Sequence, residues 1–211
     1  MIPTKNISKL QYISQVKPFK THQEAIENAL LGGCKWIQLR VKDIPEEELL
    51  AIAKDAKAMC VIHEAKLIIN DHVKIAKAVD ADGVHLGLED MKVSEARKLL
   101  GFDKIIGATA NTIEHITQHA KDVPDYIGLG PFRFTETKAK LSPILGFVGY
   151  QSIIQEVEKL QINIPIIAVG GIKSTDLDEL MQTGIHGVAI SSDINHAEKP
   201  KLKIEEIEKK L

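Results

Sequence analysis

The chain has 211 residues, of which 44% are hydrophobic, 27% are charged and only 4% are aromatic. This length fits one domain that can bury a core without disulfides or structural metals. The formal net charge of −2 provides no basic footprint for nucleic acid. No apolar run approaches the roughly 18 residues that a membrane span needs. These numbers favour an ordinary soluble globular protein.

The first ten residues contain no apolar segment of signal-peptide length. Cys34 and Cys60 stand in segments that are predicted to be buried, without the spacing of metal ligands. Reduced, buried thiols are typical of the cytosol, so a cytoplasmic location is expected. The sequence leaves the oligomeric state open, with a homo-oligomer among the alternatives.

Short apolar runs alternate with longer amphipathic stretches along the chain. The runs are rich in β-branched residues, as in strands that are buried on both faces of a parallel sheet. The predicted strands are 10–13, 36–39, 66–69, 83–86, 105–108, 126–129, 166–169 and 187–190.

Between these runs, apolar residues recur at helical spacing. The predicted helices are 21–31, 43–59, 71–78, 93–100, 112–120, 149–160, 174–182 and 203–211. Thr112 and Ser174 are predicted to cap two of them. Eight strand–helix units in about 200 residues predict a single-domain (β/α)8 TIM barrel over residues 1–211. An open doubly wound sheet is the alternative, but it would gather polar motifs at one switch point rather than after nearly every strand.

The segment 131–148 interrupts this rhythm because it shows little helical or strand pattern. Connections of this length are usually lids or disordered segments, so a mobile active-site loop is predicted. Lys138 within it could close over a charged substrate. The alternative is a flexible solvated loop whose lysines only aid solubility.

In barrel enzymes the active site lies at the carboxyl ends of the strands, so the residues after each strand are candidates. Gln38, Arg40 and Lys42 close the second strand and alternate onto one side. Two cations and an amide suit an anion with several oxygens, such as a diphosphate. Alternatively, Arg40 and Lys42 are surface charges that pair with Asp43 and the glutamates after it.

Two carboxylates follow the next strands along the chain. Asn70 and Asp71 close the third strand, and Asp90 follows the fourth. Carboxylates from neighbouring strand ends that face two cations predict a Mg²⁺ bridging a diphosphate. Alternatively, each aspartate caps the helix that follows it. His85 lies inside the fourth strand, where it is either a satisfied interior histidine or a catalytic one.

The later strand ends indicate phosphate binding. Thr109 follows the fifth strand with a hydroxyl that can bind phosphate oxygens. Gly170–Gly171 and Ser191–Ser192 follow the last two strands, where such barrels bind a single phosphate through backbone N–H groups. Asp193 would repel a phosphate there unless it points away. Together the strand ends predict an enzyme that joins a phosphorylated acceptor to a diphosphate-activated donor.

Five segments, taken in order, resemble the thiamine-phosphate synthase family. They are QLRVK at 38–42, IND at 69–71, GVHLGLED at 83–90, GLGP at 128–131 with TETK at 135–138, and GGI at 170–172. Each is short, but five in order along nearly the whole chain are specific. The resemblance implies a transferase of thiamine biosynthesis. Its substrates would be 4-amino-2-methyl-5-(diphosphooxymethyl)pyrimidine and a thiazole phosphate, and its products thiamine monophosphate and pyrophosphate.

The resemblance also implies a role for individual residues. Those implied to hold the pyrimidine diphosphate are Gln38, Arg40, Lys42, Asn70, Lys138 and Thr109, the last standing where the family usually has a serine. Those implied to hold the thiazole phosphate are Thr135, Thr137, Gly171, Ser191 and Ser192. Asp71 and Asp90 would bind Mg²⁺. With that ion, the catalytic residues Arg40, Lys42 and Lys138 would stabilise charge on the departing pyrophosphate, and the family is thought to pass through a pyrimidine carbocation.

Two residues depart from the family's motifs: Val41 replaces an acidic residue and Leu88 a polar one, both beside ligand-binding positions. Two other functions stay open. A thiazole tautomerase would share the barrel and the phosphate site, but the cations and carboxylates after the second to fourth strands argue against it. A non-catalytic thiazole phosphate-binding relative is disfavoured by the Asn70–Asp71 pair and the Thr-Lys loop.

Overall fold

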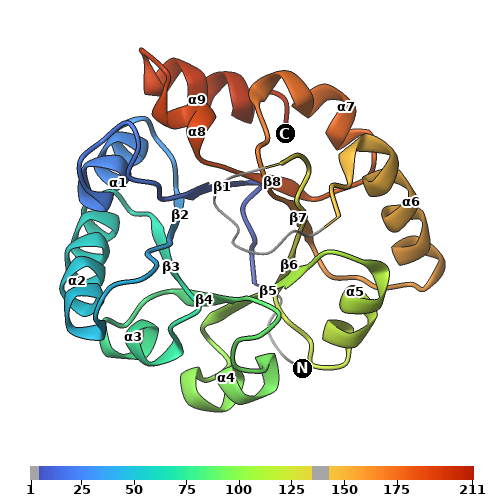
Figure 1. Cartoon of the computed structure of the whole chain (residues 1–211), viewed down its shortest axis with the longest axis horizontal. Helices are drawn as coiled ribbons and strands as arrows, with labels where there is room; N and C mark the ends of the chain where they lie inside the picture. The colour runs from blue at the N-terminus through green and yellow to red at the C-terminus, as the bar shows by residue number, and fades with distance from the viewer. Residues whose placement is uncertain (1–4, 135–142) are drawn as a thin grey trace.

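The computed structural model describes residues 5–134 and 143–211. Parallel strands pair in sequence order, and the last pairs with the first, which closes a barrel inside a ring of helices (Figure 1). The strands are β1 (Leu10–Ile13), β2 (Trp36–Leu39), β3 (Lys66–Asn70), β4 (Gly83–Leu86), β5 (Ile105–Ala110), β6 (Tyr126–Leu129), β7 (Ile166–Ala168) and β8 (Gly187–Ile190). The predicted (β/α)8 barrel is confirmed, and the open sheet is wrong because no strand edge is left unpaired among these eight.

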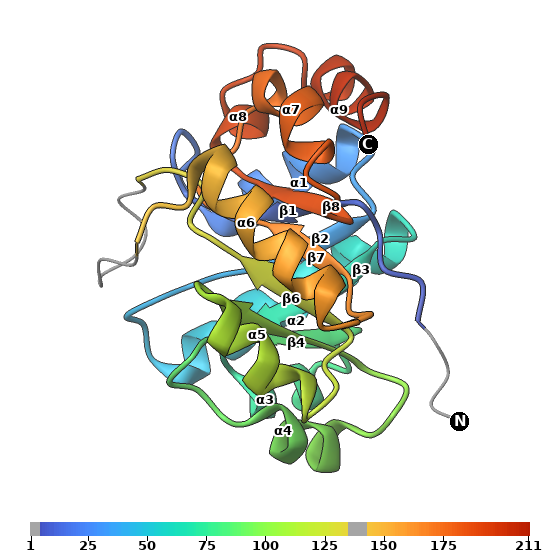
Figure 2. The ribbon, with the colours of Figure 1, turned by 90° about the vertical axis from the view of Figure 1, so that its right-hand side faces the viewer.

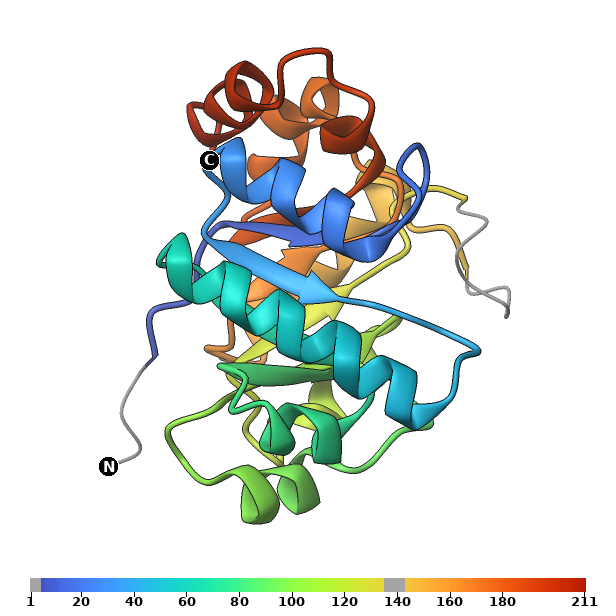
Figure 3. The ribbon, with the colours of Figure 1, turned by 90° about the vertical axis from the view of Figure 1, so that its left-hand side faces the viewer.

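The helices lie outside the barrel, in the connections between strands and after the last strand. They are α1 (His22–Leu31), α2 (Glu46–Ile62), α3 (Val73–Ala78), α4 (Val93–Leu100), α5 (Ile113–Ala120), α6 (Gly146–Lys159), α7 (Leu177–Met181), α8 (Ser192–Asn195) and α9 (Pro200–Glu208), with a 3₁₀ turn η1 at Ser174–Asp176. Helices α5 and α6 cover one flank (Figure 2), and α1 and α2 cover the opposite flank (Figure 3). No helix in the described part of the chain combines the length and apolarity of a membrane span.

Two apolar layers hold the barrel together. One lies between strands and helices and contains residues such as Ile37 and Ile69. The other fills the barrel interior and contains Trp36, Ile68 and Tyr126. Side chains alternate across a strand, so both strand faces must be apolar, which is why the strands read as continuous apolar runs. Each fully buried large apolar side chain stabilises the fold by roughly 1.5–3 kcal/mol.

The helix starts partly follow the predicted caps. Thr112 caps α5, since its hydroxyl accepts a hydrogen bond from the His115 N–H. The prediction for Ser174 is wrong, because Ser174 is already the first residue of η1. Lys173 precedes the turn, and its N–H donates to the Asp176 carboxylate at 2.7 Å. That carboxylate satisfies the N–H of the residue before the turn, and the N–H of Ser174 itself donates to Asp193.

Cys34 and Cys60 are buried, as predicted, and both are free thiols. Burial raises the pKa of the Cys34 thiol to about 11 and that of Cys60 to about 12. Because the thiolate is the reactive form, neither cysteine is suited to act as a nucleophile near neutral pH.

Candidate active site

The residues predicted from the second strand lie at the carboxyl end of the barrel. Gln38 is buried inside β2, Arg40 is half-buried just beyond it, and Lys42 is exposed. Val41, between the two cations, is buried in the layer that faces the helices. The alternation predicted from the sequence therefore holds, with the amide and the two cations on the side away from the helices.

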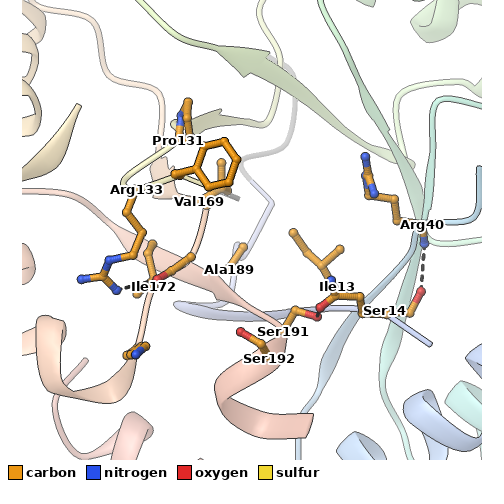
Figure 4. Close-up of a pocket in the computed structure, with 15 residues that line it drawn as sticks. Ile13, Ser14, Arg40, Pro131, Arg133, Val169, Ile172, Ala189, Ser191 and Ser192 are labelled. Carbon is orange, nitrogen blue, oxygen red and sulfur yellow. Dashed lines mark hydrogen bonds between the residues drawn. The ribbon is translucent and has the colours of Figure 1, made fainter. Parts of the chain in front are cut away.

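Ser14 fixes the backbone of this strand end. The Ser14 N–H donates to the Gln38 carbonyl at 2.8 Å, and the Ser14 hydroxyl accepts from the Arg40 N–H at 3.0 Å (Figure 4). The same hydroxyl lies 2.9 Å from Nδ1 of His22. Burial, with a smaller effect of the Arg40 charge, lowers the pKa of His22, so the ring is neutral near pH 7. The sequence reading missed Ser14, although it directly follows the first strand.

The carboxylates after β3 and β4 adjoin each other. Asp71 forms an ion pair with Lys42, and its backbone is left-handed with φ of 63°. Asp90 accepts a hydrogen bond from the Gly87 N–H at 2.6 Å. Burial raises the pKa of Asp90, and the hydrogen bond with the neighbouring Asp71 carboxyl raises it further. Two carboxyl groups so placed present oxygen ligands to one hard cation.

The structural alternatives for Lys42, Asp71 and Asp90 do not match the structure. Helix α3 is preceded by His72 and α4 by Lys92, so neither Asp71 nor Asp90 caps a helix. Lys42 pairs with Asp71 across two strand ends rather than with the acidic run of its own loop. No group of three or more His, Cys, Asp or Glu suited to a metal occurs in residues 5–134 and 143–211. Mg²⁺ needs only one or two carboxylates when substrate phosphates complete its shell, so the pair still fits this ion.

A cavity of about 400 Å³ opens at the ends of β1, β7 and β8 (Figure 4). Gly171, Ser191 and Ser192 line it, as the predicted phosphate site requires, and Arg40 lines it too. Gly171 and the preceding Gly170 have φ of 69° and 99°. A side chain at Gly170 would come within 2.7 Å of Pro131, so glycine lets the two loops touch.

An arginine that the sequence reading missed joins the loops after β6 and β7. The Arg133 guanidinium donates to the Gly171 carbonyl at 2.6 Å and to both Asp176 carboxylate oxygens at 2.7 and 2.8 Å. Burial alone would raise the pKa of Asp176, but the hydrogen bonds from Arg133 and Lys173 outweigh it and hold the pKa below its usual range. Arg133 lies across the cavity from Arg40 (Figure 4).

Asp193, whose carboxylate would repel a phosphate bound in this cavity, makes a hydrogen bond to the neighbouring loop. Asp193 accepts a hydrogen bond from the Ser174 N–H at 2.8 Å. The Ser191 hydroxyl donates to the side-chain oxygen of Gln15 at 3.0 Å. The Asp193 carboxylate is therefore bound by the loop after β7, which agrees with the expectation that it must not face a bound phosphate.

The remaining predicted residues that the structure describes lie at or below the same strand ends. Asn70 is buried at the end of β3, opposite His85 in the β3–β4 register. His85 is an interior histidine whose two ring nitrogens lie within hydrogen-bond distance of Tyr126 and Thr109. Leu88 is 44% exposed. The predicted ligands Thr135, Thr137 and Lys138 lie outside the described residues.

The barrel brings two features together on one face, a cationic, carboxylate-bearing set of strand ends and a glycine- and serine-lined cavity, and this arrangement suits an enzyme that acts on phosphorylated small molecules. The family model for thiamine monophosphate synthase matches residues 10–194. The thiamine-phosphate synthase of Flavobacterium johnsoniae is 49% identical over 97% of this chain and 96% of its own length. That of Bacteroides thetaiotaomicron is 47% identical over 90% of this chain and 91% of its own length.

A solved structure shows the same likeness. The thiamine phosphate pyrophosphorylase from Pyrococcus furiosus superposes with a TM-score of 0.82 and 32% identity, covering 96% of this chain and 94% of its own. The chain belongs to the thiamine monophosphate synthase family, and it is a transferase. The family suggested by the five motifs is thereby confirmed.

Proposed function

We propose that this enzyme transfers the (4-amino-2-methylpyrimidin-5-yl)methyl group from its diphosphate to a thiazole phosphate, giving thiamine monophosphate and pyrophosphate. The observation that carries this assignment is the position of Arg40. It belongs to the cationic strand end with Lys42, and it also lines the cavity of Gly171 and Ser191. A diphosphate held by Arg40 would meet a phosphate-bearing acceptor within one continuous site.

The donor half of the site would use the ends of β2, β3 and β4. Gln38 and Asn70 would hold the pyrimidine, and Arg40 and Lys42 the diphosphate. Asp71 and Asp90 would hold Mg²⁺, since their adjoining carboxylates leave room for substrate oxygens to complete its shell. A bound Mg²⁺ would neutralise charge on the diphosphate.

The acceptor half would use the cavity after β7 and β8. Gly171 and Ser191–Ser192 would hold the thiazole phosphate, with Thr135 and Thr137 contributing from outside the described residues. Arg133, through its bond to the Gly171 carbonyl, would keep the loop after β7 in the shape that the phosphate needs.

The reaction follows from where charge develops. The bond between the methylene carbon and the diphosphate oxygen breaks, and its electron pair leaves with pyrophosphate. The ring amino group supports the resulting cation, while Arg40, Lys42 and Lys138 stabilise the pyrophosphate. The thiazole nitrogen then supplies the electron pair of the new carbon–nitrogen bond. No protein nucleophile is needed, in keeping with the two buried, protonated cysteines.

The direct test is product formation from the pyrimidine diphosphate, the thiazole phosphate and Mg²⁺. Thiamine monophosphate and pyrophosphate are expected in equal amounts, and both should vanish with EDTA or in the Asp71→Asn/Asp90→Asn double variant. Asp80→Asn is the matched control, because Asp80 is also paired with a lysine but lies at the amino end of β4. Folded wild-type protein that isomerises the thiazole, or only binds it, would overturn the assignment.

A further inference from the structure

A continuous set of side-chain hydrogen bonds crosses the barrel interior beneath the active site. Gln38 Nε2 donates to Gln11 Oε1 at 3.0 Å, and Gln11 Nε2 donates to the Tyr126 hydroxyl at 3.3 Å. That hydroxyl lies 3.0 Å from His85 Nδ1, and His85 Nε2 lies 2.9 Å from Thr109 Oγ1. These five residues, named here the interior network, connect Gln38 on β2 to Thr109 on β5.

The interior network is enclosed and rigidly seated. Its members on β1, β2 and β6 are at most 2% exposed, and His85 is 8% exposed. The His85 and Tyr126 rings stack with centroids 5.4 Å apart. A Cβ at Gly107 would come within 2.1 Å of the Tyr126 ring, and one at Gly128 within 2.9 Å of the His85 ring. Two glycines in neighbouring strands therefore leave the space that these rings fill.

The donors and acceptors of the interior network can run in only two senses. Among the described residues the buried Tyr126 hydroxyl has two hydrogen-bond partners, Gln11 and His85, so once Gln11 donates to it, its single proton must go to His85. A neutral imidazole that accepts at one nitrogen donates from the other. If Gln11 donates to Tyr126, then Tyr126 donates to His85 Nδ1, and His85 donates from Nε2 to Thr109. The Thr109 proton is then directed out of the network. In the opposite sense Thr109 donates inward to His85.

The chemistry at the two ends selects one sense. This step rests on the proposed function, in which Thr109 faces pyrophosphate. Phosphate oxygens at neutral pH accept hydrogen bonds, so Thr109 must donate outward. In that same sense Gln38 uses an amide N–H within the network, which leaves its Oε1 to accept from the pyrimidine amino group.

We propose that Gln11, Tyr126 and His85 are positioning residues that hold the Thr109 hydroxyl proton toward the leaving pyrophosphate and Gln38 Oε1 toward the ring amino group. Neither Gln11 nor Tyr126 reaches the substrates in this role. They set the direction of the hydrogen bonds that end at Thr109 and Gln38, and these two residues contact the substrates.

The tautomer of His85 tests the sense of the network without any substrate. In ¹⁵N-histidine spectra, with the signals assigned through His85→Gln, the proton is expected on Nε2. Tyr126→Phe should weaken this preference. Tyr12→Phe should leave it unchanged, because the equally buried Tyr12 hydroxyl bonds to Asn195, outside the network. A proton on Nδ1 in the wild type would overturn the proposal.

A double-mutant cycle tests the consequence for catalysis. Tyr126→Phe is expected to lower kcat roughly tenfold, the effect of one misdirected hydrogen bond. Added to Thr109→Val, it should cost clearly less than tenfold, since one of the two groups through which it acts, the Thr109 hydroxyl, is gone and only the effect on Gln38 is left. In a Thr109→Ser background the full loss should return. Losses that simply multiply in the Thr109→Val background would show that Tyr126 is only structural. Wild-type protein without synthase activity would overturn the proposed function, and the His85 tautomer would still decide the network.

Discussion

Asp71 combines a carboxylate with a left-handed backbone, φ of 63°, and an experiment has to separate the two. Asparagine tolerates this conformation as aspartate does, whereas alanine would add strain of about 1 kcal/mol or more. Asp71→Asn should therefore leave the free energy of unfolding within about 0.5 kcal/mol of wild type. It should weaken Mg²⁺ activation by roughly 100-fold, because even the loss of a residue that only supports a metal ligand costs up to about 100-fold. Denaturant unfolding and Mg²⁺ titration of product formation measure the two effects.

Asp80 provides the matched comparison for this variant. It too has a left-handed backbone, φ of 49°, and a lysine partner, Lys104. It stands before β4 rather than after a strand. Asp80→Asn should therefore leave the Mg²⁺ dependence unchanged, and an unchanged dependence in Asp71→Asn would mean that Asp71 is not a ligand.

For single residues, the sequence predicted location on the carboxyl face of the barrel from a position directly after a strand. Arg40, Asp71 and Gly171 were predictable because the carboxyl ends of all parallel strands open on one face. Their supports were not: the Gln11–Tyr126 hydrogen bond joins positions 115 residues apart, and no local pattern reports such a pairing. A weaker signal did exist, because Gly107 within a strand pattern indicates that another group approaches closely.

The loops after β6 and β7 depend on the bidentate pair between Arg133 and Asp176. Lysine keeps the charge but cannot match both carboxylate oxygens and the Gly171 carbonyl at once. Arg133→Lys is expected to lower the free energy of unfolding by about 1–3 kcal/mol, since a buried carboxylate loses part of its partners. It should also raise KM for the thiazole phosphate more than KM for the pyrimidine diphosphate. Equal changes in both would show that the pair supports the whole barrel rather than the phosphate loop.

The Arg133–Asp176 pair also predicts that the free energy of unfolding falls at acid pH. The pKa of Asp176 is lowered in the folded protein, so its contribution to stability is complete above the ordinary pKa of an aspartate and is lost as pH falls through the lower folded pKa. Wild-type unfolding free energy should fall more steeply than that of Asp176→Asn as pH falls below about 4. Denaturant unfolding across this window compares the slopes, and parallel slopes would contradict the prediction.

Elements with enough turns to show a period were predictable, and shorter ones were not. Helix α4 has the predicted bounds, Val93–Leu100. Helix α8 spans only Ser192–Asn195, too short for a 3.6-residue period to appear, and the sequence reading missed it. Helix α6 begins at Gly146 rather than 149, since the glycine there, with φ of 54°, ends the preceding loop earlier than the apolar pattern suggested.

For the whole molecule, the barrel follows from counting units. Eight strand–helix units leave the last strand beside the first, and pairing of β1 with β8 removes both sheet edges. Closure also brings the strand ends of β2–β4, proposed to hold the donor, onto the same face as the cavity after β7 and β8, proposed to hold the phosphate, and Arg40 lines that cavity. Neither half of the site is complete in any one stretch of sequence.

Thermal stability offers a test of this division into two halves that does not require turnover. A ligand present at 100 times its Kd stabilises the folded state by about 2.7 kcal/mol, which is roughly 5–10 °C in Tm for a chain of this size. Mg²⁺-pyrophosphate and inorganic phosphate should each raise Tm. Asp71→Asn should abolish only the first shift, whereas Arg40→Gln should reduce both because Arg40 lines the cavity and belongs to the cationic strand end. If Asp71→Asn removed both shifts, the two anions would share a single site and the assignment of separate donor and acceptor halves would fail.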